Sequence, residues 1–270
     1  MTQTPMDNLT SPLHVLPRRG LLDSHNHLLP GIDDGCRNVD ESLLCIKSLC
    51  DKGYVGAICT PHGGPPSFAE NTPDLIARSV EQLQLEIEKA DLEFHIFPGS
   101  ELSLTPNLVS WLEENGVQAL AVNGDAREHG KGAVLFDYWG KSWDNFCDEF
   151  IDYLLNAGLT PVLAHPERMG IREPWVELMT SLRERGVLLQ GNLRPLTGYD
   201  GLLTQYRTEQ LLDMDAYSML CLDAHRPGCL PPRLEGLSRL RLGWGRKKFR
   251  AMVVEGPRNI AEIAFADPGG

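Results

Sequence analysis

Histidine and aspartate residues lie close together near both ends of this 270-residue chain. Asp23-Ser24-His25-Asn26-His27 follows the first apolar run, and Asp223-Ala224-His225 follows the last one. Residues i and i+2 of an extended strand project to the same side, so we expect His25 to point with His27 and Asp223 with His225. Imidazoles and carboxylates bind divalent metal ions. If the two strand ends meet, as the first and last strands of a closed barrel do, they form one metal site.

Further histidine and acidic residues stand where other predicted strands end. Asp34, in an Asp-Asp-Gly segment, also suits a turn, and Asp137, inside an apolar run, could instead pair with a basic neighbour. Nine candidate groups exceed what one ion can bind, so we expect two or three divalent ions. Mixed nitrogen and oxygen donors fit Mn, Fe or Zn without selecting among them. The candidate ligands are His25, His27, Asp34, His62, Glu101, Asp137, His165, Asp223 and His225.

The bulk composition indicates an ordinary globular protein and argues against some partners. Apolar residues make up 42% of the chain and charged residues 23%. The formal charge of −12 argues against nucleic-acid binding, which relies on clustered Lys and Arg. The first sixteen residues lack the features of a signal peptide, and no apolar run reaches the length of a membrane span, so we expect no membrane insertion.

The seven cysteines are scattered along the chain and do not form a disulfide or zinc-knuckle pattern. Reduced thiols in the cytoplasm are the simplest interpretation, and we therefore expect a cytoplasmic protein.

Short apolar runs alternate with longer amphipathic segments. The pattern predicts strands at Gly20–Ser24, Tyr54–Thr60, Glu93–Phe97, Val117–Val122, Gly132–Tyr138, Thr160–Ala164, Val187–Gln190 and Ala216–Leu222. It predicts helices at Val39–Lys52, Thr72–Ala90, Pro106–Asn115, Trp143–Asn156, Pro174–Arg185 and Leu202–Leu212.

This alternation predicts an α/β fold with a mostly parallel sheet and helices outside it. The candidate ligands recur at the carboxyl ends of the predicted strands, which is the active face of α/β barrels. Composition and spacing give no sign of a linker or an internal repeat. We therefore predict a flexible leader at residues 1–19 and a single domain at residues 20–270.

Two common catalytic motifs, and one for phosphate binding, are missing from the sequence. Pro61–Pro66 is rich in glycine but lacks the Gly-Lys-Ser/Thr ending of a P-loop. The chain has neither a G-x-S-x-G elbow nor a cysteine followed by arginine at the C-x5-R spacing. A phosphatase with this sequence must therefore use water activated by metal ions.

The order of the motifs resembles the polymerase and histidinol phosphatase (PHP) superfamily. The matching segments are His25-Asn-His27, Asp34-Gly, Thr60-Pro-His62, Gly99-Ser-Glu101, Leu135-Phe-Asp137, Ala164-His165-Pro-Glu-Arg168 and Asp223-Ala-His225. More narrowly, the chain is similar to the bacterial manganese-dependent protein-tyrosine phosphatases of capsule and exopolysaccharide operons, the CpsB/CapC-like type. The resemblance extends from about Leu21 to Ile260.

The resemblance implies a distorted (β/α)7 TIM-like barrel, the PHP fold, with up to three metal ions, most simply Mn²⁺. It implies that the chain is a phosphomonoester hydrolase whose substrate is a phosphotyrosine protein, such as an autophosphorylating tyrosine kinase of polysaccharide export. The nine candidate residues become the metal ligands. Arg168 becomes the catalytic phosphate-binding residue, and Arg226 is a second candidate for substrate binding.

The chain departs from the family pattern at three positions. Gly63 follows His62 where the family has His or Arg, and Asp137 replaces a glutamate. Leu230 stands where the family has a phosphate-binding arginine, although Arg226 is close in sequence. The metal ligands match better than the substrate-binding residues, so metal-dependent hydrolysis is the safer prediction than phosphotyrosine specificity.

Three alternatives stay open on sequence grounds. One is a small-molecule phosphatase of the histidinol-phosphate type, and another is a metal-binding regulatory module with weakened catalysis. An amidohydrolase also begins with His-x-His on a barrel strand, but it usually needs a bridging lysine at a strand end, where this chain has none. Turnover of phosphotyrosine peptide, compared with histidinol phosphate, would separate these functions.

Overall fold

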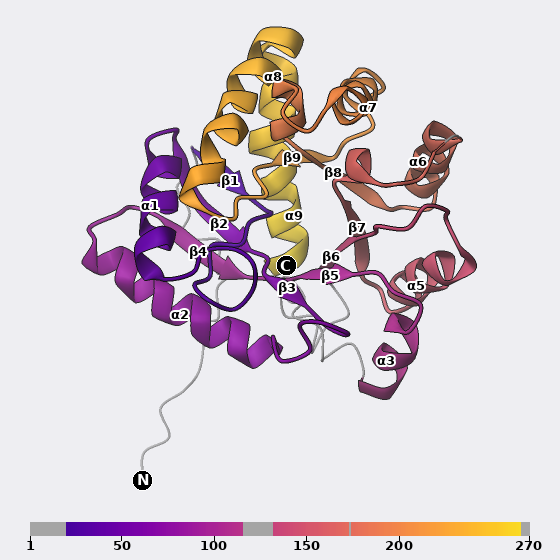
Figure 1. Cartoon of the computed structure of the whole chain (residues 1–270), viewed down its shortest axis with the longest axis horizontal. Helices are drawn as coiled ribbons and strands as arrows, with labels where there is room; N and C mark the ends of the chain where they lie inside the picture. The colour runs from indigo at the N-terminus through magenta and orange to yellow at the C-terminus, as the bar shows by residue number, and fades with distance from the viewer. Residues whose placement is uncertain (1–19, 116–131, 173, 266–270) are drawn as a thin grey trace.

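The structure is a computed structural model that describes residues 20–115, 132–172 and 174–265. Its strands form two parallel sheets, in the orders β1-β2-β4 and β3-β5-β6-β7-β8-β9 (Figure 1). The strands are β1 (Leu21–Asp23), β2 (Tyr54–Cys59), β3 (His62–Gly63), β4 (His95–Pro98), β5 (Glu101–Ser103), β6 (Ala133–Asp137), β7 (Thr160–Ala164), β8 (Leu188–Asn192) and β9 (Met219–Cys221).

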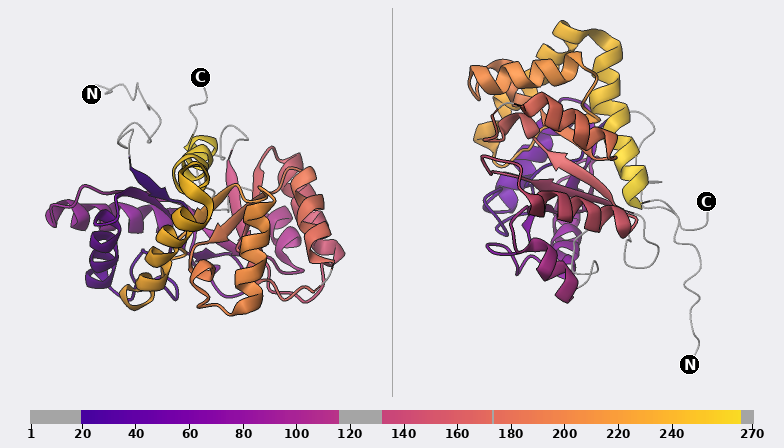
Figure 2. Two further views of the ribbon diagram at one scale, coloured as in Figure 1. Left: turned by 90° about the horizontal axis from the view of Figure 1, so that it is seen from above. Right: turned by 90° about the vertical axis from the view of Figure 1, so that its right-hand side faces the viewer.

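Helices surround these strands (Figure 2). The α-helices are α1 (Val39–Cys50), α2 (Pro73–Lys89), α3 (Leu108–Asn115), α5 (Asn145–Asn156), α6 (Trp175–Glu184), α7 (Leu202–Asp213), α8 (Leu230–Arg250) and α9 (Gly256–Phe265). Short 3₁₀ turns are η3 (Pro166–Arg168), η4 (Arg194–Thr197) and η5 (Pro227–Cys229), and η6 (Ala251–Glu255) is a π-helical turn.

Two strands of the barrel are each interrupted and continue in the second sheet. β2 leads into β3 across Thr60 and Pro61, and β4 leads into β5 across Gly99 and Ser100. Proline has no N–H for a sheet hydrogen bond, which favours a break at that point. When each interrupted pair is taken as one strand, the described chain contains seven parallel strands, so the predicted distorted barrel is confirmed.

The barrel is closed where the first and last strands end. Asn26 forms a parallel bridge with Ala224. The His27 N–H donates to the Ala224 carbonyl at 2.8 Å, and the Asp223 N–H donates to the His25 carbonyl at 2.8 Å. The predicted meeting of the two histidine-containing segments is therefore confirmed.

The apolar core has two parts, one inside the barrel and one outside it. The inner part takes one or two side chains from each of several strands, including Leu22, Ile58, Leu135 and Val162, and packs them against α9. The larger outer part fills the space between strands and surrounding helices. Full burial of one such side chain contributes about 1.5–3 kcal/mol, so both parts hold the strand ends firmly in place.

Most predicted elements are confirmed to within a few residues, but the sequence pattern missed four. The strands β3 and β5 are too short to give an alternating pattern. Helix α8 contains three glycines and has two prolines directly after its first residue, which hide its helical period, and Gly245 interrupts it with a φ of +78°. Helix α9 also lies beyond the last predicted element.

Two sequence predictions fall on residues outside the described ranges: the strand at 117–122 and the leader at residues 1–19. Within those ranges, none of the helices has both the length and the apolar composition needed to cross a membrane.

Candidate metal centre

All nine predicted ligands lie together at the carboxyl ends of the strands. Seven of them line an open cavity of about 460 Å³, and His25 and His27 lie beneath it, fully buried. Three groups of these residues place their donor atoms within 4.8 Å of one another. The groups are His27-Asp34-His62-His225, His25-His27-Asp223 and His25-Glu101-His165.

Glu101, the first residue of β5, lies at the centre of the cluster and is 1% exposed. Its Oε2 atom is 3.2 Å from His25 Nε2 and 3.4 Å from His27 Nε2. Its Oε1 atom is 3.0 Å from His165 Nε2. Its Oε2 atom is also 3.4 Å from His62 Nδ1, so one carboxylate faces histidines from three strand ends and would be able to help hold divalent ions there.

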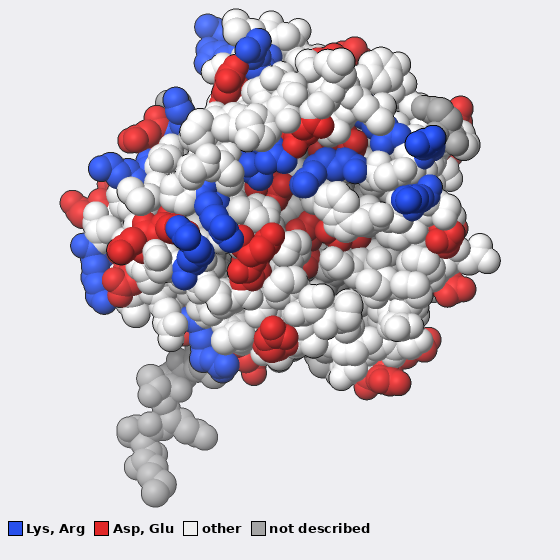
Figure 3. Space-filling view, in the orientation of Figure 1, with Lys and Arg blue, Asp and Glu red and all other residues white. Residues whose placement is uncertain are grey.

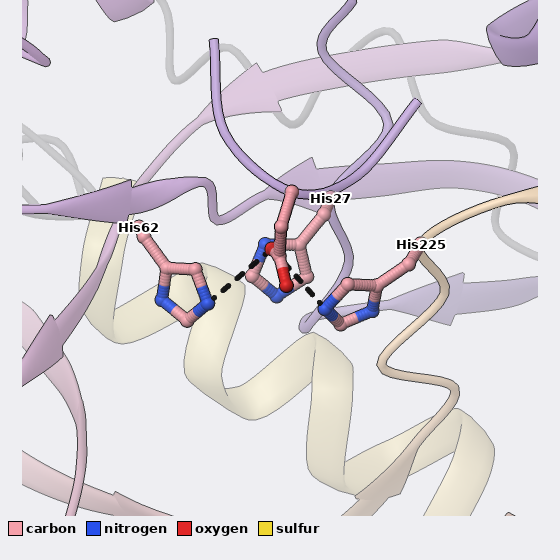
Figure 4. A group of neighbouring side chains, drawn as sticks. His27, His62 and His225 are labelled. Atoms are coloured by element: carbon pink, nitrogen blue, oxygen red, sulfur yellow. Dashed lines mark ion pairs between the residues drawn. The ribbon is translucent and has the colours of Figure 1, made fainter. Parts of the chain in front are cut away.

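The outer part of the cluster lies nearer to solvent. Figure 4 shows the rings of His27, His62 and His225 turned toward one another. Asp34 Oδ1 is 3.5 Å from Nε2 of both His62 and His225, and its side chain is 59% exposed. Asp34 therefore faces the donor atoms of two histidines, and its role as a ligand stays a prediction.

Two polar residues that the sequence analysis did not identify orient the buried histidines. Gln190 Oε1 accepts a hydrogen bond from His25 Nδ1 at 2.6 Å, and Asp33 Oδ2 accepts one from His27 Nδ1 at 2.7 Å. Each contact leaves Nε2 facing the cluster as a lone-pair donor. Asp33 lies beside Asp34, and Gln190 ends a predicted strand, so both positions carried a usable signal.

Several buried donor atoms in this cluster have no hydrogen-bond partner among the described residues. They include Nε2 of His25, Nε2 of His27 and Nδ1 of His62. Buried polar atoms are nearly always paired, and unpaired ones mark the place of an ion or water. Nitrogen and carboxylate donors converging on one point fit divalent cations.

The charges of the protein groups lead to the same conclusion. Burial disfavours a protonated His25 ring, but the negative charges of Glu101 and Asp223 outweigh it and raise the pKa of His25 to about 9. Burial opposes ionisation of Glu101, yet the neighbouring histidines hold the pKa of its carboxyl well below the usual range. The cluster thus favours positive charge at its centre, which is the charge that a divalent ion supplies.

His225 titrates differently from His25. Burial and the neighbouring His27 lower the pKa of His225 to about 4. Its ring is therefore neutral at pH 7 and able to act as a ligand without losing a proton.

Asp223 and His165 stand in strained backbone conformations. Asp223 has a φ of +50° and His165 a φ of +33°, values that non-glycine residues rarely adopt. The expectation that Asp223 and His225 project together from an extended strand is thus wrong, because β9 ends at Cys221. The turn still places His225 Nδ1 3.4 Å from Asp223 Oδ1.

Asp137 lies outside the three donor groups of the described chain. Its Oδ2 atom accepts a hydrogen bond from Trp139 Nε1 at 2.5 Å, and its Oδ1 atom is buried without a hydrogen-bond partner. It lines the cavity beside Glu101, and its role as a ligand stays a prediction.

The predicted substrate-binding arginines lie in different places. Arg168 lines the cavity, donates from Nη1 to Asp223 Oδ2 at 3.1 Å and lies 5.0 Å from the centre of the Trp139 ring. Arg226 donates to the backbone carbonyls of Gly35 and Asp34, each at 3.1 Å. Leu230 is buried in the outer core and only 2% exposed. Arg194 and Arg233, which the sequence analysis did not identify, also line the cavity.

Comparison with known proteins places these features in a family. The family model of capsular polysaccharide synthesis proteins, CpsB/CapC, matches residues 21–262. Tyrosine-protein phosphatase YwqE of Bacillus subtilis (strain 168) is 26% identical over 206 residues, covering 76% of this chain and 77% of YwqE. Tyrosine-protein phosphatase CpsB of Streptococcus agalactiae serotype V is 23% identical over 246 residues, covering 89% of this chain and 98% of CpsB.

Solved structures show the same fold. A chain from the crystal structures of YwqE from Bacillus subtilis and CpsB from Streptococcus pneumoniae, which are metal-dependent tyrosine phosphatases, aligns with a TM-score of 0.71 at 23% identity. The alignment covers 90% of this chain and 92% of that one. The phosphotriesterase homology protein of Escherichia coli aligns with a TM-score of 0.54 at 12% identity, covering 91% and 99%.

The fold and the donor groups define a distorted TIM-like barrel with a candidate metal centre at the carboxyl ends of its strands. Within that class, the chain belongs to the CpsB/CapC family of capsular polysaccharide synthesis proteins. The family resemblance expected from the sequence is thereby confirmed.

Proposed function

We propose that this chain is a metal-dependent phosphomonoester hydrolase that acts as a protein-tyrosine phosphatase. The main support is the convergence of three donor groups on the floor of an open cavity that arginines also line. The names of the relatives YwqE and CpsB, both tyrosine-protein phosphatases, support the choice of substrate.

Different residues are proposed to hold the metal ions and to bind the phosphoryl group. His25, His27 and Glu101 would hold divalent ions, with Gln190 and Asp33 fixing the orientation of the two rings. Such ions supply positive charge for phosphoryl oxygens and bring the pKa of water within reach of neutrality.

Arg168 is proposed to bind the phosphoryl group. Its Nη1 atom is held by Asp223, and the guanidinium lies over the Trp139 ring, so its remaining N–H groups keep a fixed direction. A fixed guanidinium stabilises charge that builds on phosphoryl oxygens without a cost in reorganisation. Arg226 donates to the backbone carbonyls of Gly35 and Asp34, and Asp34 lines the cavity. We propose Arg226 as a further substrate contact beside Asp34.

We also propose the finer features that the family resemblance suggests. The ions are two or three Mn²⁺, the substrate is an autophosphorylating tyrosine kinase of exopolysaccharide or capsule export, and the protein works in the cytoplasm. Seven free cysteines support a reducing compartment.

One assay tests the proposed function against its alternatives. The purified protein, loaded with Mn²⁺, is compared on phosphotyrosine peptide and histidinol phosphate, with and without chelator. We expect turnover of the peptide that chelator abolishes. Preference for histidinol phosphate would favour the small-molecule phosphatase, and metal binding without any turnover would favour the regulatory module. Full activity in chelator would contradict a metal-dependent mechanism.

A further inference from the structure

Three arginines line the cavity, and their hydrogen bonds separate them by role. Arg233 is 4% exposed and donates to the backbone carbonyls of Leu222, Asp223 and Cys229. Its Nε and Nη1 groups donate to the backbone around Asp223, and its Nη2 atom lies 3.9 Å from Asp223 Oδ2, so Arg233 supports the end of β9. Arg168 and Arg194 are more open, with side chains 27% and 18% exposed.

The guanidinium of Arg194 is held by the same kinds of contact as that of Arg168. Asp200 accepts from Nε of Arg194 at 2.9 Å and also from Nη2, and the guanidinium carbon lies 5.4 Å from the centre of the Tyr199 ring. Each of these two arginines thus has one aspartate that fixes it and one aromatic ring beside it. In the described chain, no residue accepts from Nη1 of Arg194, which leaves that group available to a ligand.

The local backbone explains why Arg194 is held in this position. The turn η4 starts at Arg194 and ends at Thr197. The next residue, Gly198, has a φ of +77°, and the chain reverses there so that Asp200 faces Arg194. Helix α8 supports the turn from below, because a Cβ atom at Gly236 would lie 2.3 Å from the Leu193 carbonyl oxygen. The close packing makes η4 a rigid base.

Arg194 lines the same cavity as the acidic residues Glu101 and Asp223. Asn192, two residues earlier at the end of β8, donates to Asp223 Oδ2 at 2.8 Å, and Arg168 contacts the same oxygen. Figure 3 shows acidic side chains near the middle of this face with basic ones beside them. A phosphomonoester carries two negative charges near pH 7, so a fixed guanidinium beside the floor offers it a charge-assisted hydrogen bond.

We propose that Arg194, fixed by Asp200 and Tyr199, is a second residue of this cavity that binds the phosphoryl group, in addition to Arg168. This inference rests on the proposed function, because it assigns the phosphoryl group to the same cavity. Asp200 is a positioning residue that acts only through Arg194.

The test measures binding of inorganic phosphate to the Mn²⁺-loaded protein by titration calorimetry. We expect R194Q to weaken phosphate binding about tenfold or more, which is about 1.4 kcal/mol, and to raise KM for p-nitrophenyl phosphate. Mn²⁺ affinity and melting temperature should match those of the unchanged protein. R194K keeps the positive charge but loses the paired hydrogen bonds to Asp200, so its phosphate affinity should lie between those of the unchanged protein and R194Q.

The matched control is R239Q, which removes an exposed arginine that Glu235 holds on α8, away from the cavity. It should leave phosphate affinity unchanged. Unchanged phosphate affinity in R194Q would overturn the role of Arg194 while leaving the phosphatase function intact. If the unchanged protein binds phosphate but hydrolyses no phosphomonoester, the proposed function fails, and R194Q still decides the role of Arg194. No phosphate binding by the unchanged protein would overturn both.

Discussion

The floor of the cavity and its rim are built by different means. The floor consists of His25, His27, Glu101 and Asp223, which are at most 1% exposed and lie at or just beyond strand ends. The rim consists of Arg168, Trp139 and Arg194, which lie after strands in turns, and Trp139 is 53% exposed. Barrel closure fixes the floor, whereas each rim arginine depends on one aspartate.

This difference suggests that the floor carries out hydrolysis and that the rim selects the substrate. The floor brings together residues from both ends of the chain, so its geometry requires the whole barrel. Each rim residue can change without moving a strand. We therefore expect changes in the floor to decide whether hydrolysis occurs, and changes in the rim to alter which substrate binds and how tightly.

The largest effect should come from removing the first histidine pair of the floor. His25→Ala combined with His27→Ala removes donors from all three groups, and we expect loss of bound metal and a fall in kcat/KM of about 10³-fold or more. Metal analysis and hydrolysis of p-nitrophenyl phosphate measure both. The control is His95→Ala, a half-buried histidine on β4 outside the cluster. A double variant that kept a tenth of the activity would contradict the role of the floor.

A second test uses the pH dependence of the chelated, metal-free protein. The folded-state pKa of His25, about 9, lies above the ordinary value of 6.5. The bound proton therefore contributes stability that is complete below pH 6.5 and is lost as pH rises through 9. We expect up to about 3 kcal/mol of this loss in denaturant unfolding between these pH values. His25→Gln should reduce this loss, and His27, whose pKa is also raised, should account for a remaining part. A flat profile for the unchanged chain would count against the charge balance described for the floor.

A smaller effect is expected from changing Asp33, which orients the ring of His27 in the floor. Asp33→Asn removes the charge that holds His27 Nδ1, and loss of such a partner weakens metal binding by about 10–100-fold. A metal titration measures the change. Asp40→Asn, an exposed aspartate at the start of α1, is the control. Equal Mn²⁺ affinity in both variants would mean that Asp33 does not orient the ring.

The smallest effect is expected at the rim. Trp139→Phe keeps an aromatic ring near Arg168 but removes the N–H that Asp137 accepts. We expect a change of about 1 kcal/mol, seen as a KM for p-nitrophenyl phosphate raised about fivefold with kcat little altered. Trp143→Phe, which removes a hydrogen bond to Asp148, is the matched control. A large fall in kcat would instead mean that Trp139 is needed for hydrolysis, as the floor residues are.

The floor was easier to predict from the sequence than the rim. Its residues stand where predicted strands end, and parallel strands of a barrel bring those ends to one face. Eight of the nine predicted ligands fall in the three donor groups, although their ligand role stays a prediction. Asp137 lies outside them, since its carboxylate instead accepts from Trp139, a contact that no spacing rule predicts.

The rim depends on contacts between segments that are not neighbours in any pattern. Arg194 faces the cavity because Gly198 reverses the chain and α8 supports the turn. Helix α8 itself was hidden by its glycines and prolines. Arg226 was expected to bind substrate because it is close in sequence to Leu230, which stands where the family has a phosphate-binding arginine. Its guanidinium donates to the carbonyls of Asp34 and Gly35, a contact that no sequence pattern indicated.

The pairing of Asn26 with Ala224 has a consequence for how the protein is made. The two segments are separated by roughly 200 residues, which a ribosome takes about 10–40 s to synthesise at 5–20 residues per second. During that interval the amino-terminal histidines have emerged while their carboxyl-terminal partners do not yet exist. Cation capture is therefore a late event in biogenesis, and a nascent chain truncated before β9 cannot assemble the centre.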